Sequence, residues 1–306
     1  MSPKIKHLVI SGGTNAGFSF FGVLQKLIDE HFLKCDELES VYATSAGTLT
    51  ALFILLKYDM ETIETFLVQR PWGEAFRIDL SAILRAIQTG GLFDKSIANT
   101  AMGPLLLGKD LSLDITLEEF YQFNPVDFHL YATNYTTLEL VDISYKTHPN
   151  WKLLDAVYAS CCLPILFVPF CPNESEMYID GAVITNYPLS NCLRDGRDPD
   201  EILGIYYFSD CENEIRNAHP LKGESLYKLF DYLLSFVMKL WVRIIATPSL
   251  EDSIRVSNQI KILCPDTSIP QLMVVFNSQE ERKKMIAEGT EEATKFLSRS
   301  MKICDE

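Results

Sequence analysis

Apolar residues occur along the chain in two alternating patterns, one typical of strands and one typical of helices. Short β-prone apolar runs recur through residues 7–208, and between them apolar residues return at the three- and four-residue spacing of helices. Strands are predicted at residues 7–10, 39–43, 128–133, 138–144 and 202–208, and helices at residues 18–32, 49–56, 60–68, 80–87, 96–102 and 151–160. Because each of the first two strands leads into a helix, we predict an α/β protein with a parallel sheet.

The last third of the chain is dominated by helical spacing. Residues 226–245 carry one continuous apolar stripe, and Tyr232, Phe236 and Val242 lie off that stripe. The predicted helix is therefore more apolar than one buried face requires. It either presents a surface to lipid or to a second copy of the chain, or is enclosed in the core. A charged helix is predicted at residues 278–303.

Composition and charge narrow the classes of function. The 306 residues are 47% hydrophobic, enough for a large buried core. Lys and Arg total 27 against 41 Asp and Glu, and the net charge of -14 argues against sequence-independent binding to nucleic acid or to strongly anionic membranes. No segment has the run of about 20 apolar residues that crosses a bilayer, and the apolar stretch at the N-terminus is too short for a signal peptide. We expect a cytoplasmic protein that meets any membrane or micelle surface peripherally.

The eight cysteines do not indicate a metal site. They form no C-x-x-C pair, and no histidine stands at metal-ligand spacing from them. Reduced structural thiols are expected, and the adjacent pair Cys161 and Cys162 is either redox-sensitive or simply buried. The sequence also has no EF-hand calcium loop. We therefore expect neither a metal nor another cofactor.

The residues around Ser45 have the pattern of a nucleophile elbow. A β-prone run ends at this serine, and an apolar helix begins directly after it. A serine on a tight strand-to-helix turn needs small residues two positions before and two after it, because Cβ atoms crowd there. Ala43 and Gly47 meet that need. The alternative is that Ser45 is only the N-cap of the following helix.

A glycine-rich turn follows the first strand. Gly12, Gly13 and Thr14 precede a helix that opens at Gly17, so their N–H groups and the helix dipole favour negative charge at this place. Such a turn fits an oxyanion hole for acyl transfer. The alternative is a phosphate cradle, but the turn lacks the lysine of a P-loop and the middle glycine of G-x-G-x-x-G.

The third motif is Asp180 with Gly181 and Ala182, at the end of a short predicted strand. The chain has five histidines, and none follows this aspartate in a turn-rich setting, as the order of a classical triad requires. A dyad of Ser45 with Asp180 as its base therefore fits better. The alternative is that this Asp-Gly pair only forms a turn.

In this order, the three motifs resemble those of the patatin-like phospholipases, which are serine acyl hydrolases with a Ser-Asp dyad. The same framework is matched by residues 91–94, 132–134, 159–169 and 180–188, and the resemblance covers about residues 6–210. It implies a three-layer α/β/α fold with a mainly parallel central sheet. It also implies the following roles: Ser45 as the nucleophile, Asp180 as the general base, Gly12, Gly13 and Thr14 as the oxyanion turn, and Gly17, Ala43, Gly47, Gly181 and Ala182 as supporting motif residues.

Three positions depart from the family pattern. Thr14 stands where the family usually has a third glycine, and its branched Cβ narrows the conformational choice of the turn. Ala16 stands where the family usually has Arg or Lys, and the lost cation is expected to lower activity or change the preferred head group. Ala43 replaces the first glycine of the elbow but remains small.

The resemblance implies a lipid acyl hydrolase of the phospholipase A or lysophospholipase type. This serine esterase would cleave a phospholipid or another fatty-acyl ester through an acyl-Ser45 intermediate. Two alternatives use the same residues: a weak or inactive patatin-like protein that binds lipid or acts as a scaffold, and an acyltransferase. Residues 6–210 would form the catalytic core, and residues 211–306 a mostly helical C-terminal part packed on it.

Overall fold

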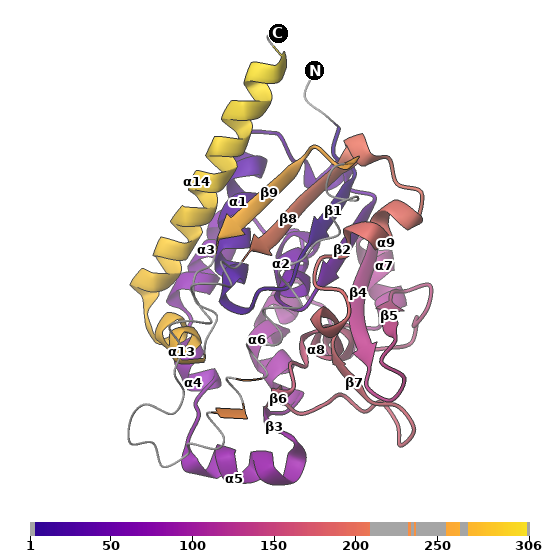
Figure 1. Ribbon diagram of the computed structural model, residues 1–306, viewed down its shortest axis with the longest axis vertical. Coiled ribbons are helices and arrows are strands. Elements are labelled where there is room, and N and C mark those ends of the chain that lie inside the picture. The colour runs from indigo at the N-terminus through magenta and orange to yellow at the C-terminus, as the bar shows by residue number, and fades with distance from the viewer. Residues whose placement is uncertain (1–3, 209–231, 234–235, 237–254, 264–268, 305–306) are drawn as a thin grey trace.

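The computed structural model of the chain describes residues 4–208, 232, 233, 236, 255–263 and 269–304. Within them, the two strands predicted first form the middle of a seven-stranded sheet (Figure 1). β1 (His7–Ile10) and β2 (Ser40–Thr44) pair in parallel, with Ile10 opposite Ala43. The two strands therefore end side by side, and the segments that follow them meet at one edge of the sheet.

The strand order of the sheet is β5-β4-β2-β1-β8-β9, and β7 also pairs with β4. The remaining strands are β4 (Asp127–Asn134), β5 (Leu140–Ile143), β7 (Tyr178–Asp180), β8 (Ile202–Phe208) and β9 (Gln259–Leu263). β5 and β7 run antiparallel to β4, and the other pairs are parallel. The prediction of a mainly parallel sheet is confirmed. A separate two-stranded sheet joins β3 (Gly91–Phe93) to β6 (Ile165–Phe167).

Helices follow most of the strands, as the hydrophobic spacing predicted. They are α1 (Gly17–Asp29), α2 (Ala46–Leu55), α3 (Met60–Gln69), α4 (Trp72–Ala75), α5 (Leu80–Thr89), α6 (Ser96–Leu107), α7 (Leu117–Phe123), α8 (Leu153–Cys161), α9 (Leu189–Arg194), α13 (Ile269–Asn277) and α14 (Gln279–Cys304). Short 3-10 turns lie at Thr14–Ala16, Cys35–Glu37, Gly181–Val183 and Pro199–Glu201. The sequence did not predict α4, α7, α9, α13 or β3, which are short. None of the helices within the described ranges is both long and apolar enough to cross a membrane.

The ends of several helices follow the usual capping chemistry. The Asp59 carboxylate accepts the N–H of Thr62 at 2.8 Å and opens α3, and Asp79 does the same for α5 through Ala82. Gly90 ends α5 with φ at 83°, a left-handed conformation that favours glycine. These local contacts fix where the helices that cover the sheet begin and end.

Alternating side chains of the strands enter two separate hydrophobic clusters, one on each face of the sheet. On one face, Val41 and Ala43 belong to the large core with α1 and α2. On the other face, Val9 and Tyr42 pack with α9 in a smaller cluster. Helices therefore cover both faces of the sheet, and the predicted three-layer α/β/α architecture is confirmed.

The C-terminal part packs directly against the core through α14. This helix lies along α1 (Figure 1). A Cβ at Gly22 would lie 2.0 Å from the Ile286 carbonyl oxygen, and one at Gly289 would lie 1.9 Å from the Ser19 carbonyl oxygen, so both glycines permit a close approach of the two helices. The buried Arg282 donates to carbonyl groups at the ends of α3 and α13. The division of the chain near residue 210 stays a prediction.

Two further expectations concern the last third of the chain. The apolar helix predicted at residues 226–245 lies mostly outside the described residues, and so does Val242. Of the residues that are described there, Tyr232 and Phe236 are exposed, with their rings stacked 6.4 Å apart. The helix predicted at residues 278–303 is observed as α14.

Candidate active site

Ser45 lies between the end of β2 and the start of α2. Its backbone has φ at 51° and ψ at -126°, which is rare for a residue with a side chain and costs on the order of 1–3 kcal/mol. The turn is tight: a Cβ at Gly47 would lie 2.6 Å from the carbonyl oxygens of Ile10 and Ser11. Ser45 occupies the N-cap position, but its side chain makes no capping hydrogen bond to α2. Its hydroxyl is directed elsewhere.

That hydroxyl donates to Asp180 across the edge of the sheet. The distance from Ser45 Oγ to Asp180 Oδ2 is 2.6 Å, and the other carboxylate oxygen accepts the N–H of Ala182 at 2.8 Å. β7 brings Asp180 there by pairing with β4, with Asp180 opposite Ala132. A Cβ at Gly181 would lie 2.2 Å from the Tyr131 carbonyl oxygen, so glycine is required at that position. The structure thus brings together the serine and the aspartate singled out from the sequence.

The environment of Asp180 favours its protonated form. Its side chain is fully buried, and burial raises the pKa of this carboxyl to about 7, although hydrogen bonds from Ser45 and from the Ala182 N–H act in the opposite direction. Among the described residues, no cationic side chain forms an ion pair with it. A carboxyl with this pKa exchanges a proton readily near neutral pH.

The glycine-rich turn lies against Ser45. A Cβ at Gly12 would lie 3.0 Å from the Ser45 Cβ. The Gly12 N–H donates to the Asn186 carbonyl oxygen at 3.0 Å, whereas the N–H groups of Gly13 and Thr14 have no hydrogen-bond partner among the residues that the structure describes. The turn therefore holds two free donors, and its first glycine lies against Ser45.

Thr14 and Ala16, the two marked departures from the family pattern, behave differently in the turn. Thr14 has φ at 46°, in the left-handed region that is unfavourable for a β-branched residue, and its hydroxyl donates to the Asn15 side chain at 3.0 Å. Ala16 is fully buried and its Cβ lies close to Gly13. Of the supporting residues, Gly17 is the first residue of α1 and Ala43 lies within β2.

The sequence suggested no role for Ser160, whose side chain contacts the turn at Ser45. Its hydroxyl accepts the N–H of Ser45 at 3.0 Å and donates to the carbonyl of Tyr131 at 2.6 Å. This hydroxyl therefore ties the strained serine to β4. The only signal in the sequence was that Ser160 falls within one of the segments that match the family framework.

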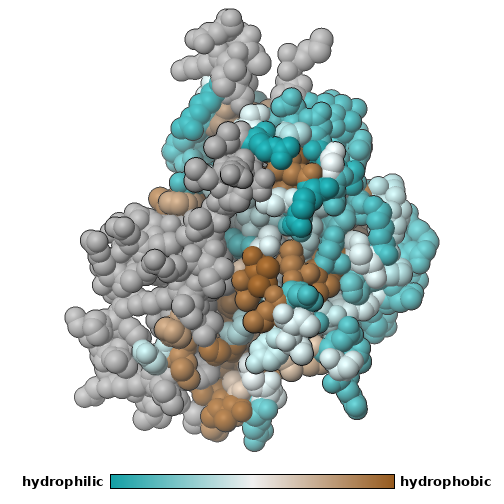
Figure 2. Space-filling view, turned by 45° about the vertical axis from the view of Figure 1, so that its right-hand side comes forward, coloured by the Kyte–Doolittle hydropathy of each residue, from teal (hydrophilic) through white to brown (hydrophobic). Residues whose placement is uncertain are grey.

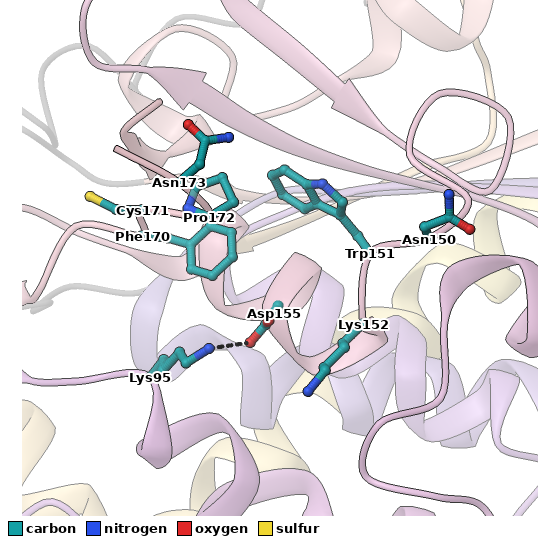
Figure 3. A pocket seen from close by; sticks show the side chains of 9 residues that line it. All are labelled: Lys95, Asn150, Trp151, Lys152, Asp155, Phe170, Cys171, Pro172 and Asn173. Carbon is teal, nitrogen blue, oxygen red and sulfur yellow. Dashed lines mark hydrogen bonds and ion pairs between the residues drawn. The ribbon is translucent and has the colours of Figure 1, made fainter. Parts of the chain in front are cut away.

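A separate hollow of about 380 Å³ lies at the other end of α8 (Figure 3). Its walls include the rings of Trp151 and Phe170 and the side chains of Lys95 and Asp155, which form an ion pair at 3.4 Å. Asp155 near the N-terminal end of α8 lines this hollow, whereas Ser160 near the C-terminal end of the same helix bonds to Ser45. Neither Ser45 nor Asp180 lines this hollow. Within the described residues, no group of three His, Cys, Asp or Glu side chains is placed to hold a metal ion.

Apolar side chains reach the surface at several places in the described part of the chain. Figure 2 shows hydrophobic surface gathered at the centre and foot of one face, with hydrophilic surface beside it. Ile184, four residues after Asp180, is 44% exposed, and α5 exposes Leu84 and Ile87. Exposed apolar groups of this kind suit contact with a lipid.

Comparison with known proteins gives a consistent result. The family model described as patatin-like phospholipase matches residues 8–193. The chain is 25% identical over 197 residues to a "probable lipid hydrolase" of Invertebrate iridescent virus 6, covering 63% of this chain and 66% of that protein. It is 25% identical over 206 residues to a triacylglycerol lipase of Schizosaccharomyces pombe, covering 59% of this chain and 40% of the lipase. The chain thus spans slightly under two thirds of the first relative and less than half of the second.

Among solved structures, VipD from Legionella pneumophila is similar to this chain with a TM-score of 0.57 at 18% identity. The match covers 97% of this chain and 67% of VipD. At this identity the likeness concerns the fold alone.

Proposed function

The chain belongs to the patatin-like phospholipase family, a family of lipid hydrolases, and we propose that it cleaves fatty-acyl esters through an acyl-serine intermediate. In this proposal Ser45 is the nucleophile and Asp180 the general base. The observation that carries it is the 2.6 Å contact between the Ser45 hydroxyl, on a strained elbow, and the buried Asp180 carboxyl. A serine and a base within hydrogen-bond reach are the minimum equipment of nucleophilic acyl transfer.

In the proposed acylation step, the Ser45 oxygen attacks the ester carbonyl carbon while its proton moves to Asp180. The carbonyl oxygen becomes an oxyanion, which the N–H groups of Gly13 and Thr14 would receive because the Gly12 N–H is already bonded to Asn186. Collapse of the tetrahedral intermediate breaks the ester C–O bond. The leaving alcohol then takes the proton back from Asp180.

In the proposed deacylation step, water attacks the acyl-Ser45 ester. Asp180 takes one proton from the water and passes it to the Ser45 oxygen as that oxygen leaves. The products are a free fatty acid and the original dyad. A carboxyl with a pKa of about 7 can act in both directions at neutral pH, because its two protonation states are both populated there.

The substrate class is proposed from the family and from the surface. The relatives are named for lipid or triacylglycerol hydrolysis, and apolar side chains such as Ile184 are exposed close to Asp180 in the sequence. We propose a phospholipid, a lysophospholipid or a related fatty-acyl ester met at a membrane or micelle surface. The cytoplasmic location expected from the sequence stays a prediction.

The experiment that tests this function is fatty-acid release from a panel of phospholipids, lysophospholipids and neutral esters. Parent protein is compared with Ser45→Ala and Asp180→Asn, and labelling by a fluorophosphonate probe is measured in parallel. Ser40→Ala is the matched control, because Ser40 is also buried but lies at the opposite end of β2, where it bonds to His7. EDTA is expected to leave turnover unchanged, since the dyad itself supplies the base. A parent protein that releases no fatty acid and leaves the probe unreacted overturns the proposal.

A further inference from the structure

We infer that Ser11, supported by Asn186, is a positioning residue for the oxyanion turn. The two side chains hold the peptide between Gly12 and Gly13 in the orientation that presents the Gly13 N–H to an oxyanion formed at Ser45. This inference rests on the proposed function and deepens it, because it names the side chains that orient the turn to stabilise an oxyanion.

The Ser11 hydroxyl has its direction fixed by its two partners. Ser11 is fully buried directly after β1, and its oxygen accepts the N–H of Tyr207 at 2.8 Å. The same oxygen lies 2.8 Å from the Gly12 carbonyl oxygen. Because the Tyr207 N–H can only donate, the hydroxyl hydrogen of Ser11 is left for the Gly12 carbonyl. The hydroxyl thus connects β8 to the turn.

Asn186 holds both polar groups of Gly12. Its backbone carbonyl accepts the Gly12 N–H at 3.0 Å, and its side-chain Nδ2 donates to the Gly12 carbonyl at 3.4 Å. The reverse orientation of the amide would place its oxygen against that carbonyl, acceptor against acceptor. The amide oxygen is buried without a hydrogen-bond partner among the described residues, and a Cβ at Gly12 would lie 2.5 Å from it. The absence of a side chain at Gly12 therefore lets Asn186 approach.

Fixing the Gly12 carbonyl also fixes the Gly13 N–H. The described chain has no cis peptide bond, and in a trans peptide the C=O and the following N–H point in opposite directions. With the carbonyl held on the side of Ser11 and Asn186, the Gly13 N–H points to the other side. A peptide between two glycines rotates more freely than others. If it turned over, a carbonyl oxygen would face the developing oxyanion and repel it.

The test measures kcat and KM on a soluble short-chain ester for parent, Ser11→Ala, Asn186→Ala and the double variant. Each single variant has a matched control away from the site. Ser40→Ala removes an equally buried hydroxyl, which bonds to His7. Asn124→Ala removes an amide that is 8% exposed, as Asn186 is, and that donates to the Leu55 carbonyl at 2.8 Å. Thermal unfolding of all variants gives the structural cost of each change.

We expect Ser11→Ala to lower kcat by about 10- to 100-fold with KM nearly unchanged, since removal of a true oxyanion donor costs about 10²- to 10³-fold. Asn186→Ala, which removes the longer bond, is expected to lower kcat by about 3- to 10-fold, and the double variant by more than the product of the two. The controls are expected to lose similar Tm and to keep kcat within about twofold.

Two outcomes overturn the inference and differ from each other. If the parent hydrolyses esters and the double variant retains its kcat, or loses it only in proportion to Tm as the controls do, the two side chains are merely structural. If the parent reacts with neither ester nor fluorophosphonate, the proposed function fails and the inference fails with it. Should Ser11→Ala not fold, Asn186→Ala alone decides, because its backbone bond to Gly12 is retained.

Discussion

Two buried carboxyl groups lie at opposite ends of β4 and differ in almost every respect. Asp127 opens the strand, and Asp180 lies opposite Ala132 near its other end. Asp127 contacts the Lys146 ammonium and lies 3.2 Å from His129 Nε2, whereas no cation of the described residues pairs with Asp180. Burial acts to raise both pKa values. The cations around Asp127 outweigh it and lower its pKa, while the pKa of Asp180 rises to about 7.

Asp127, His129, Asp142 and Lys146 form what we call the His129 cluster, and Arg197 lies 3.6 Å from Asp127 as a further cation. His129 Nδ1 lies 2.8 Å from Asp142, and its ring stacks on Tyr42 at 4.4 Å. Burial opposes the charge on His129, but the two carboxylates outweigh it and raise its pKa to about 9. The cluster is therefore a set of compensated charges. The comparison teaches that the presence of a cation decides whether a buried carboxyl stabilises the fold or can take up a proton.

The largest expected effect separates the two aspartates by activity. Asp180→Asn removes the proposed base and is expected to lower kcat by about 10⁴-fold or more. Losses of this size are typical when a base that acts together with a nucleophile is removed. Asp127→Asn leaves the dyad untouched and is expected to keep kcat per folded molecule within about threefold. Ester hydrolysis at 20 °C, with the folded fraction measured by circular dichroism, makes the test. Equal losses in both variants would contradict the distinction.

The same two substitutions should act on stability in opposite directions. An unfolded Asp180 ionises above its ordinary value of 3.8, but the folded one only above about 7, so stability falls as the pH rises between these values. At pH 8 Asp180→Asn is expected to stabilise the fold by up to about 4 kcal/mol, since one pKa unit is worth about 1.4 kcal/mol.

Asp127 follows the opposite rule. Its lowered pKa contributes stability above its ordinary value, and that stability is lost as the pH falls. Asp127→Asn is expected to cost about 3 kcal/mol, because it leaves buried His129 without one of its two carboxylates. Urea unfolding of both variants at pH 8 measures the difference. A destabilised Asp180→Asn would show that its carboxylate has a partner of its own.

The pH dependence of the rate sharpens the comparison further. The proposed base is the ionised form of Asp180, and that form becomes populated as the pH rises through about 7. The kcat/KM is therefore expected to rise about tenfold per pH unit between pH 5 and pH 7 and to level off above it. Asp127→Asn serves as the control and should keep the same profile. A rate that is flat from pH 5 to pH 8 would exclude Asp180 as a base of this pKa.

The contact between Ser45 and Asp180 could be predicted from the sequence because each of the two residues lies in a short local motif. Ser45 directly follows β2 and Asp180 is the last residue of β7, and packing demands a glycine two positions after Ser45 and one position after Asp180. A Cβ would lie 2.6 Å from a backbone oxygen at Gly47 and 2.2 Å from one at Gly181. Steric needs of this kind leave a short motif that can be recognised without the structure.

The side chains around Ser45 and Asp180 could not be predicted in the same way. Ser11 bonds to Tyr207, and Asn186 bonds to Gly12. These contacts join segments that lie far apart in the sequence, and no hydrophobic periodicity or motif spacing connects them. The partners of His129 are likewise set by the pairing of β4 with β5.

Strand β9 was also missed. It is an edge strand whose five residues alternate buried Ile260 and Ile262 with exposed Lys261, and so short a pattern does not stand out.

The smallest expected effect concerns Thr14, which replaces the usual third glycine of the family in the oxyanion turn. Its φ of 46° strains a β-branched residue, so Thr14→Gly relieves about 1 kcal/mol, and the greater freedom of glycine in the unfolded chain offsets most of this gain. The donor is the backbone N–H, which glycine retains, so kcat is expected to change by less than about threefold. Lys57→Gly is the matched control, because Lys57 has φ at 56° away from the dyad. Thr14→Gly could instead raise kcat tenfold while Lys57→Gly did not. That result would show that the side chain of Thr14, rather than the hydrogen bonds of Ser11 and Asn186 to Gly12, limits how well the turn stabilises the oxyanion formed at Ser45.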